Sequence, residues 1–84
     1  MSKRSIDIQV NEDGARMIAM LVQIASRFQS EINISQDNKT VNAKSIMGMM
    51  TLGLNPGQQL EVSADGDDAE KALDTMEQYL AGAN

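Results

Sequence analysis

Hydrophobic and polar residues alternate along three stretches of the chain, which is the pattern of strands with one buried face. The stretches cover residues 6–10, 32–35 and 60–64, and a shorter extended pattern resumes at residues 40–41. Asp37 and Asn38 separate the second stretch from residues 40–41, and both residue types tolerate the backbone angles of a tight turn. The pattern therefore predicts three strands and a further one that closes a hairpin.

Two longer stretches place hydrophobic residues at the spacing of one helix face. The first runs over residues 15–28 and the second over residues 69–80, where Asp67 or Asp68 is the expected N-cap and Gly82 the expected end. Both helices are expected to pack on the sheet. The first is also apolar on a second flank, which either enters the core or belongs to a docking patch; this flank holds Met17, Met20 and Ile24.

A third, much shorter helix of one to two turns is predicted over residues 45–52. Ser45 is a favourable N-cap, and Gly53 is a suitable residue to end the helix. So short a helix cannot turn every large side chain inward, and we expect one or two of its methionines to face solvent; these are Met47, Met49 and Met50. Methionine is favoured both in cores and at contact surfaces, so either role is open for them.

The elements follow the order strand, helix, strand, strand, short helix, strand, helix. Strands that are polar on one face require helices on the other face only. The sequence therefore predicts an α+β fold, an open-faced two-layer sandwich formed by a single domain over residues 1–84. An exposed edge at residues 40–42 could pair with another chain, and we expect a monomer or a weak homodimer.

Composition narrows the class of protein. The chain has 84 residues, of which 42% are hydrophobic, and its core must be aliphatic because Phe28 and Tyr79 are the only aromatic residues. Twelve acidic and seven basic residues give a net charge of −5, which disfavours direct binding to nucleic acid or to an anionic membrane. No stretch approaches the roughly 20 apolar residues of a membrane span, and no apolar segment follows Lys3 and Arg4 as in a signal peptide. We therefore expect a cytoplasmic protein.

The chain contains no histidine and no cysteine, which removes the usual general base at neutral pH and the thiolate nucleophile. The acidic run at residues 65–70 lacks the glycine and glutamate spacing of a calcium loop, and residues 53–57 lack the spacing of a phosphate-binding loop. Glu12 and Asp13 are interpreted as a solvated loop. We therefore expect no enzyme activity, no metal site and no cofactor.

Ser45 is the most informative candidate, because it lies between the cation of Lys44 and the large apolar side chains of Ile46 and Met47. A phosphate on this hydroxyl would add about −1.5 to −2 charges at the start of a helix. Capping serines are common, so the residues alone favour a simple N-cap. An acyl carrier protein also has a modified serine at a helix start, but its all-helical fold and the Asp before that serine do not match this chain.

Three segments carry a resemblance to a known family: LVQIASRF at residues 21–28, VNAKSIMG at residues 41–48 and MMTLGL at residues 49–54. The chain resembles HPr, the phosphocarrier of the bacterial sugar phosphotransferase system, and above all the Crh-type members of that family, which act in carbon catabolite repression. The resemblance covers essentially the whole chain. It implies a βαββαβα fold with an antiparallel sheet of strand order 1423.

The family carries its transported phosphate on a histidine within a GxHARPA motif just before the first helix. Ala15 and Arg16 match the Ala-Arg of this motif, and Gly14 occupies the histidine position. Met17 stands where the family has proline. Crh-type members also lack the histidine, so the resemblance implies that this chain takes no part in phosphohistidine transfer.

Ser45 matches the serine that HPr kinase/phosphorylase modifies in the family. The serine-phosphorylated form binds catabolite control protein A, a LacI-type repressor, and promotes its binding to DNA. The resemblance implies that this chain is a phosphoprotein and a transcription corepressor; the residues expected at the repressor contact are Arg16, Lys44, Ile46, Met47 and Met50. The alternative is an unphosphorylated HPr-like interaction module that binds a metabolic enzyme or the kinase.

Overall fold

The computed structural model describes residues 1–82, so the last two residues of the expected domain lie outside it. Seven elements follow one another along the chain: β1 (Ser2–Asp7), α1 (Gly14–Ala25), β2 (Glu31–Gln36), β3 (Lys39–Asn42), α2 (Ile46–Met49), β4 (Gln59–Asp65) and α3 (Ala69–Leu80). The strands form one four-stranded sheet in the order β1-β4-β2-β3, with every neighbouring pair antiparallel. The predicted element order, strand order and α+β class are confirmed.

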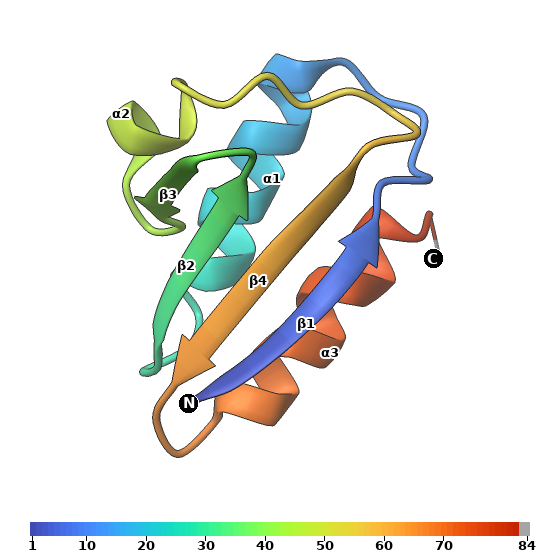
Figure 1. Cartoon of the computed structure of the whole chain (residues 1–84). Coiled ribbons are helices and arrows are strands. Elements are labelled where there is room, and N and C mark those ends of the chain that lie inside the picture. The colour runs from blue at the N-terminus through green and yellow to red at the C-terminus, as the bar shows by residue number, and fades with distance from the viewer. Residues whose placement is uncertain (83–84) are drawn as a thin grey trace.

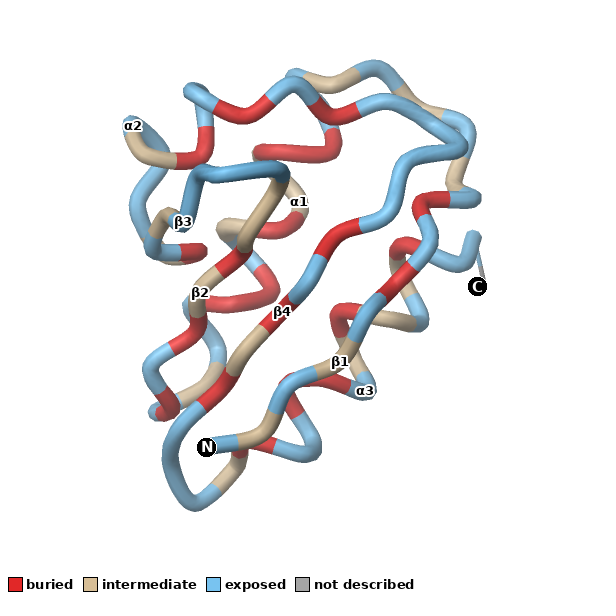
Figure 2. Tube along the Cα trace, viewed as in Figure 1, coloured by how far each residue is buried: buried red, intermediate tan, exposed pale blue. Residues whose placement is uncertain are grey.

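The fold has two layers, as Figure 1 shows: α1 and α3 cover one face of the sheet, and the opposite face stays open. The burial of strand residues alternates accordingly (Figure 2). Ile32 and Ile34 of β2, like Leu60 and Val62 of β4, are almost fully buried, whereas their neighbours along each strand are more exposed. One buried and one solvated face per strand is the reason for the alternation in the sequence.

The core between the two layers is aliphatic. Its largest fully buried side chains come from both layers and include Ile6, Leu21, Ile34, Leu60, Leu73 and Leu80. Met17 and Ile24 on the second flank of α1 are 0% and 4% exposed, and Met20 is partly buried, so this flank belongs to the core and not to a docking patch. None of the helices within residues 1–82 combines the length and the apolar character that crossing a membrane requires.

The first strand differs from its predicted boundaries. β1 begins at Ser2, well before the alternating stretch, because residues 2–7 pair along their whole length with β4. The strand ends at Asp7, but Ile8 is still buried, and its amide donates to the Gln58 carbonyl at 2.7 Å. Pairing with a partner strand therefore extends β1 into a polar segment that has no strand pattern of its own.

The helix ends follow the prediction in part. α1 ends at Ala25 and not at residue 28, and Phe28 packs against the core from the segment beyond the helix. α2 ends at Met49, earlier than predicted, and its C-cap is Met50, which has a right-handed helical φ of −66°. Gly53 therefore lies beyond the helix and does not terminate it. α3 ends as predicted: Gly82 follows it with a left-handed φ of 80°, and its amide donates to the Tyr79 carbonyl at 3.0 Å.

Asp68 is the N-cap residue of α3, as expected, and its carbonyl accepts a hydrogen bond from the Ala72 amide at 2.9 Å. Its side chain, however, makes no capping hydrogen bond to the helix. Its carboxylate accepts hydrogen bonds from the Gln29 amide at 2.9 Å, from the Ser30 amide at 3.0 Å and from the Ser30 hydroxyl. The Ser30 hydroxyl and these amides favour the charged form and lower the pKa of Asp68. The carboxylate thus ties the connection between α1 and β2 to the start of α3.

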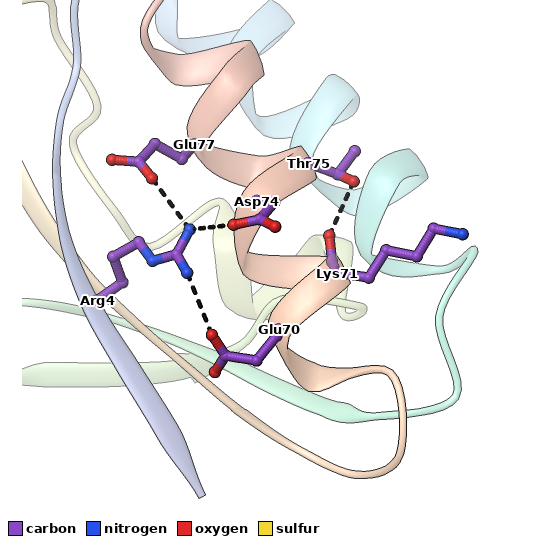
Figure 3. A network of polar contacts seen from close by, with 6 residues as sticks. All are labelled: Arg4, Glu70, Lys71, Asp74, Thr75 and Glu77. Carbon is purple, nitrogen blue, oxygen red and sulfur yellow. Dashed lines mark hydrogen bonds and ion pairs between the residues drawn. The ribbon is translucent and has the colours of Figure 1, made fainter.

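A second polar contact ties the edge strand β1 to α3. The Arg4 guanidinium contacts three carboxylates of that helix: Asp74 at 2.6 Å, Glu77 at 3.0 Å and Glu70 at 3.4 Å (Figure 3). The hydrogen bond with Asp74 is the main reason why the pKa of Arg4 is raised. Side chains therefore hold β1 in place in addition to its backbone pairing with β4.

Candidate functional site

The candidate site lies at the corner where the start of α1 meets α2. Asp13 is the N-cap of α1: its Oδ1 accepts a hydrogen bond from the Arg16 amide at 2.8 Å, and its carbonyl accepts one from the Met17 amide at 3.0 Å. The side chain of Met17 is fully buried in the core. The residue that stands at the family's proline position therefore supplies a backbone donor that proline lacks, and α1 begins as an ordinary capped helix.

Glu12 and Asp13 lie in the loop before α1, as interpreted, and Asp13 is exposed, but both carboxylates also make specific contacts. Glu12 Oε2 accepts a hydrogen bond from the Tyr79 hydroxyl at 2.7 Å and lies 3.7 Å from Arg16 Nε. Burial of Tyr79, and then its bond to the Glu12 carboxylate, raises the pKa of the phenol above its ordinary value. Glu12 links the end of α3 to the start of α1, while the side chain of Arg16 stays 66% exposed.

Gly14 lies at the beginning of α1, against the segment that follows α2. Figure 1 shows this segment passing over the start of α1. A Cβ atom on Gly14 would lie 3.0 Å from the Leu54 carbonyl oxygen, which is tighter than ordinary van der Waals contact. Any side chain at position 14 would therefore press on the backbone of Leu54.

The short helix α2 presents an apolar surface to solvent. Its N-cap is Ser45, an exposed residue whose Oγ accepts a hydrogen bond from the Gly48 amide at 3.2 Å. Three exposed side chains beside it form what we call the α2 patch: Ile46 (52% exposed), Met47 (80%) and Met50 (68%). Met49 is fully buried. The capping role of Ser45 and the expectation of one or two solvent-facing methionines are confirmed.

A groove of about 520 Å³ lies between the α2 patch and the start of α1. Its walls are Gly14, Ala15 and Ile18 of α1, Ile46 and Met50 of α2, and residues 52–55. The groove joins position 14 to the α2 patch in one continuous and mainly apolar surface. Arg16 and Met47 are not part of its lining.

Lys44 is engaged within the molecule. Its Nζ donates a hydrogen bond to the Phe28 carbonyl at 2.7 Å, just beyond the end of α1, and its amide donates to Asn42 Oδ1 at 2.8 Å. The side chain is half-buried. Lys44 thus fixes the segment that leads into Ser45, a positioning contact that the sequence did not reveal.

The site offers a solvent-facing hydroxyl, an apolar patch and an open groove. Within the described residues, 1–82, no three His, Cys, Asp or Glu side chains are grouped so that they could hold a metal ion. The fold and the site together define a small, open-faced α+β protein that presents an exposed apolar patch and a groove at one corner.

Comparison with known proteins identifies the family. A family model described as the PTS HPr component phosphorylation site matches residues 5–82. The chain belongs to the HPr family. This agrees with the strand order and with the residues that carried the resemblance.

Individual relatives point to the Crh-type branch. The HPr-like protein Crh of Bacillus subtilis (strain 168) is 42% identical over 66 residues, which are 79% of this chain and 78% of the relative. The crystal structure of a phosphocarrier protein HPr from Bacillus anthracis is similar with a TM-score of 0.88 and 39% identity, covering 94% of this chain and 95% of the other. The crystal structure of Bacillus subtilis Crh, described as a domain-swapped, intertwined dimer, is similar with a TM-score of 0.76 and 34% identity. The match covers 100% of this chain and 95% of the Crh chain. The chain is an HPr-like protein of the phosphotransferase and catabolite-repression family.

Proposed function

We propose that this chain is a cytoplasmic, non-enzymatic regulatory protein that HPr kinase/phosphorylase phosphorylates on Ser45. In this proposal the whole chain acts as one HPr-like domain, and its phosphorylated form is a corepressor that binds catabolite control protein A. One observation carries the proposal: an exposed serine hydroxyl lies directly beside the exposed α2 patch. The similarity to Crh adds support.

The surroundings of Ser45 suit a phosphate. Its Oγ already acts as a hydrogen-bond acceptor, from the Gly48 amide, and an ester oxygen can keep that role. A phosphate would add about −1.5 to −2 charges and three acceptor oxygens at a site that faces solvent, so the fold need not open to receive it. We therefore expect phosphorylation to change the charge of the surface and not the core.

The α2 patch would supply the apolar part of the repressor contact. Burying one large aliphatic or methionine side chain contributes roughly 1.5–3 kcal/mol, so Ile46, Met47 and Met50 together can support a specific contact. Arg16 would provide a polar contact, because its side chain is mostly exposed and its ion pair with Glu12 is long. Lys44 would act by positioning the segment before Ser45.

Phosphocarrier transfer through an imidazole is excluded from this proposal, because the chain contains no histidine. Gly14, which the resemblance places at the histidine position, offers the backbone alone. The proposed role is regulation and not sugar transport. As Crh has been solved as a dimer, we propose that this chain is a monomer that can form a weak homodimer.

The first test is phosphorylation of the intact protein. Purified protein is incubated with HPr kinase/phosphorylase and ATP, and its mass is measured. We expect the gain of one phosphate by the wild type and none by Ser45→Ala. Ser5→Ala is the matched control, because Ser5 is also exposed but lies on β1. No gain on the wild type, or a gain that persists in Ser45→Ala, would refute the proposed site.

The second test measures binding to purified catabolite control protein A by calorimetry, with and without the phosphate. We expect binding by the phosphorylated protein only, and weaker binding after Met47→Ser. Equal binding by both forms, or none by either, would instead favour the unphosphorylated module that binds a metabolic enzyme or the kinase.

A further inference from the structure

Sulfur is distributed unevenly over this molecule. The chain has seven methionines and no cysteine. Four methionines are buried or partly buried; they are Met17, Met20, Met49 and Met76. The exposed ones are Met1 at 80%, Met47 at 80% and Met50 at 68%. Two of the three exposed thioethers therefore belong to the α2 patch.

We propose that Met47 and Met50 form a reversible oxidation site that switches the α2 patch from an apolar to a polar docking surface. The effect on binding rests on the proposed function of this patch as a repressor contact. The oxidant is a hydroperoxide such as hydrogen peroxide. A lone pair of the thioether sulfur attacks one peroxide oxygen, the O–O bond breaks and an S–O bond forms. The proton of the transferred oxygen passes to the departing hydroxide, which leaves as water.

The structure favours these two sulfur atoms over the others. A peroxide can reach an exposed thioether in the folded protein, whereas Met17, Met49 and Met76 are fully buried. No thiolate in this chain competes for the oxidant, because there is no cysteine. Met47 and Met50 are three residues apart in a helical segment, so both products lie on the same side of α2.

Oxidation would change the surface and leave the fold intact. A sulfoxide oxygen is a hydrogen-bond acceptor, and an apolar contact would bury it without a donor. Met49 is buried in the core and anchors α2 there. Because its sulfur is shielded from the oxidant, this anchor persists after oxidation of the surface. The oxidised patch therefore loses its partner while the domain stays folded. Methionine sulfoxide reductases, one for each sulfoxide epimer, return it to the apolar state. A dithiol supplies two electrons and two protons and becomes a disulfide, the S–O bond breaks, and the oxygen leaves as water.

The experiment uses the full chain, phosphorylated on Ser45 and treated with hydrogen peroxide. Peptide mass spectrometry should place the added oxygen on Met1, Met47 and Met50 before it appears on the buried methionines, with an unchanged circular dichroism spectrum. Calorimetry with catabolite control protein A should show binding weakened at least about tenfold, and recovery after reductase treatment.

The variant Met47→Leu/Met50→Leu separates the switch from general oxidation. It removes both thioethers, keeps their apolar volume, and retains Met1 as an equally exposed thioether outside the α2 patch. The repressor affinity of this variant is compared only with itself, before and after peroxide, and we expect peroxide to leave it unchanged. Retention on a hydrophobic-interaction column reports on the patch without any partner. Oxidation should lower it clearly more for the wild type than for the double variant, which keeps Met1 as its exposed thioether.

The two proposals fail in different ways. Failure of the reduced phosphoprotein to bind the repressor would overturn the proposed function, and the column retention would still decide whether oxidation converts the patch. Unchanged retention overturns the oxidation site. Equal binding by oxidised and reduced protein, or a peroxide effect that persists in the double variant, also overturns it.

Discussion

The contact between Arg4 and α3 allows a quantitative test of how the edge strand β1 is held. Nη1 of Arg4 lies 2.6 Å from Asp74 Oδ1 and 3.0 Å from Glu77 Oε1, and Nη2 lies 3.4 Å from Glu70 Oε1 (Figure 3). The substitution Arg4→Gln removes the cation and leaves three carboxylates on one side of the helix. We expect it to destabilise the folded state.

The expected magnitude follows from the exposure of the partners. The side chains of Asp74, Glu77 and Glu70 are 62%, 46% and 70% exposed, so each ion pair contributes about 0.2–1 kcal/mol. The three pairs together therefore contribute about 0.6–3 kcal/mol. The repulsion among the carboxylates is present with and without Arg4, so it adds nothing to the difference. We therefore expect Arg4→Gln to lower the free energy of unfolding by about 0.6–3 kcal/mol in low salt. The unfolding midpoint should fall by about 4–8 °C for each kcal/mol.

Thermal unfolding followed by circular dichroism measures this loss, at low salt and near 1 M NaCl. At about 1 M salt the Debye length is only about 3 Å, so most of the difference between variant and wild type should disappear. Lys3→Gln is the matched control. Lys3 lies on the same strand and its replacement changes the net charge equally, but its side chain is 61% exposed and its Nζ lies 4.0 Å from Glu61 Oε1. We expect its effect to stay within about 0.5 kcal/mol.

Two results would refute this reasoning. If Arg4→Gln and Lys3→Gln destabilise equally, net charge and not the contact with α3 is responsible. If the loss in Arg4→Gln is the same at high salt, packing of its aliphatic stem is responsible instead, since the side chain is only 26% exposed.

Three further variants test other contacts. Asp68→Asn should destabilise the protein at neutral pH, and the difference from the wild type should vanish in acid. The lowered pKa of this carboxyl contributes stability above the ordinary value of 3.8, and the contribution is lost as the pH falls through the folded-state pKa. Urea unfolding across this pH range measures the difference. Gly66→Ala should cost about 1–3 kcal/mol in urea unfolding, because its φ is 152° and a Cβ would lie 2.8 Å from Ser30 Cα. Tyr79→Phe should cost about 0.5–1.5 kcal/mol by removing the hydrogen bond to Glu12. Because the folded-state pKa of this phenol is raised, its contribution should be complete below pH 10.0 and decline above it, as urea unfolding in alkaline buffers would measure.

Each of these variants has its own control. Asp67→Asn removes a neighbouring carboxylate, and an equal loss of stability there would show that the contact of Asp68 is not specific. Gly53→Ala should be nearly neutral, because Gly53 has open space around its Cβ position and no left-handed φ. For Tyr79→Phe, a loss that is the same on both sides of pH 10.0 would contradict the titration of Tyr79.

Local patterns predicted the elements, but long-range pairing decided their limits. The alternation around Ile32 and Leu60 identified strands because each strand has one buried face. The residues Ser2 to Ser5 carry no such pattern, and only their pairing with β4 makes them a strand. Helix ends depend on the same kind of contact, since Phe28 packs on the core although it lies beyond α1.

The sequence predicted the local features of the candidate site but not its long-range contacts. The sequence could predict Ser45 as a cap and exposed methionines on α2, because a cap and a short helix are local features. It could not predict that Lys44 would reach the Phe28 carbonyl, or that Glu12 would bind a tyrosine 67 residues away. Long polar side chains have many possible partners, and only the tertiary fold selects one. The capping role of Asp13 could have been predicted from the sequence, because an aspartate directly before an apolar helical stretch is a helix-start signal.

The start of α1 and the α2 patch border one groove, and Ser45 caps α2 beside it, but the start of α1 and the cap of α2 depend on different contacts. At position 14 the backbone packs so closely on Leu54 that a side chain would disturb it, while Met17 completes the first helical hydrogen bond in place of a proline. Ser45 depends on neither of these contacts. Its Oγ accepts a hydrogen bond from the Gly48 amide, and Lys44 fixes the segment before it through the Phe28 carbonyl. With no side chain at Gly14, the groove is bounded there by backbone alone. Ile46 and Met50 of the α2 patch line the same groove, so a partner that contacts the patch there would also face the backbone of Gly14 and not a side chain.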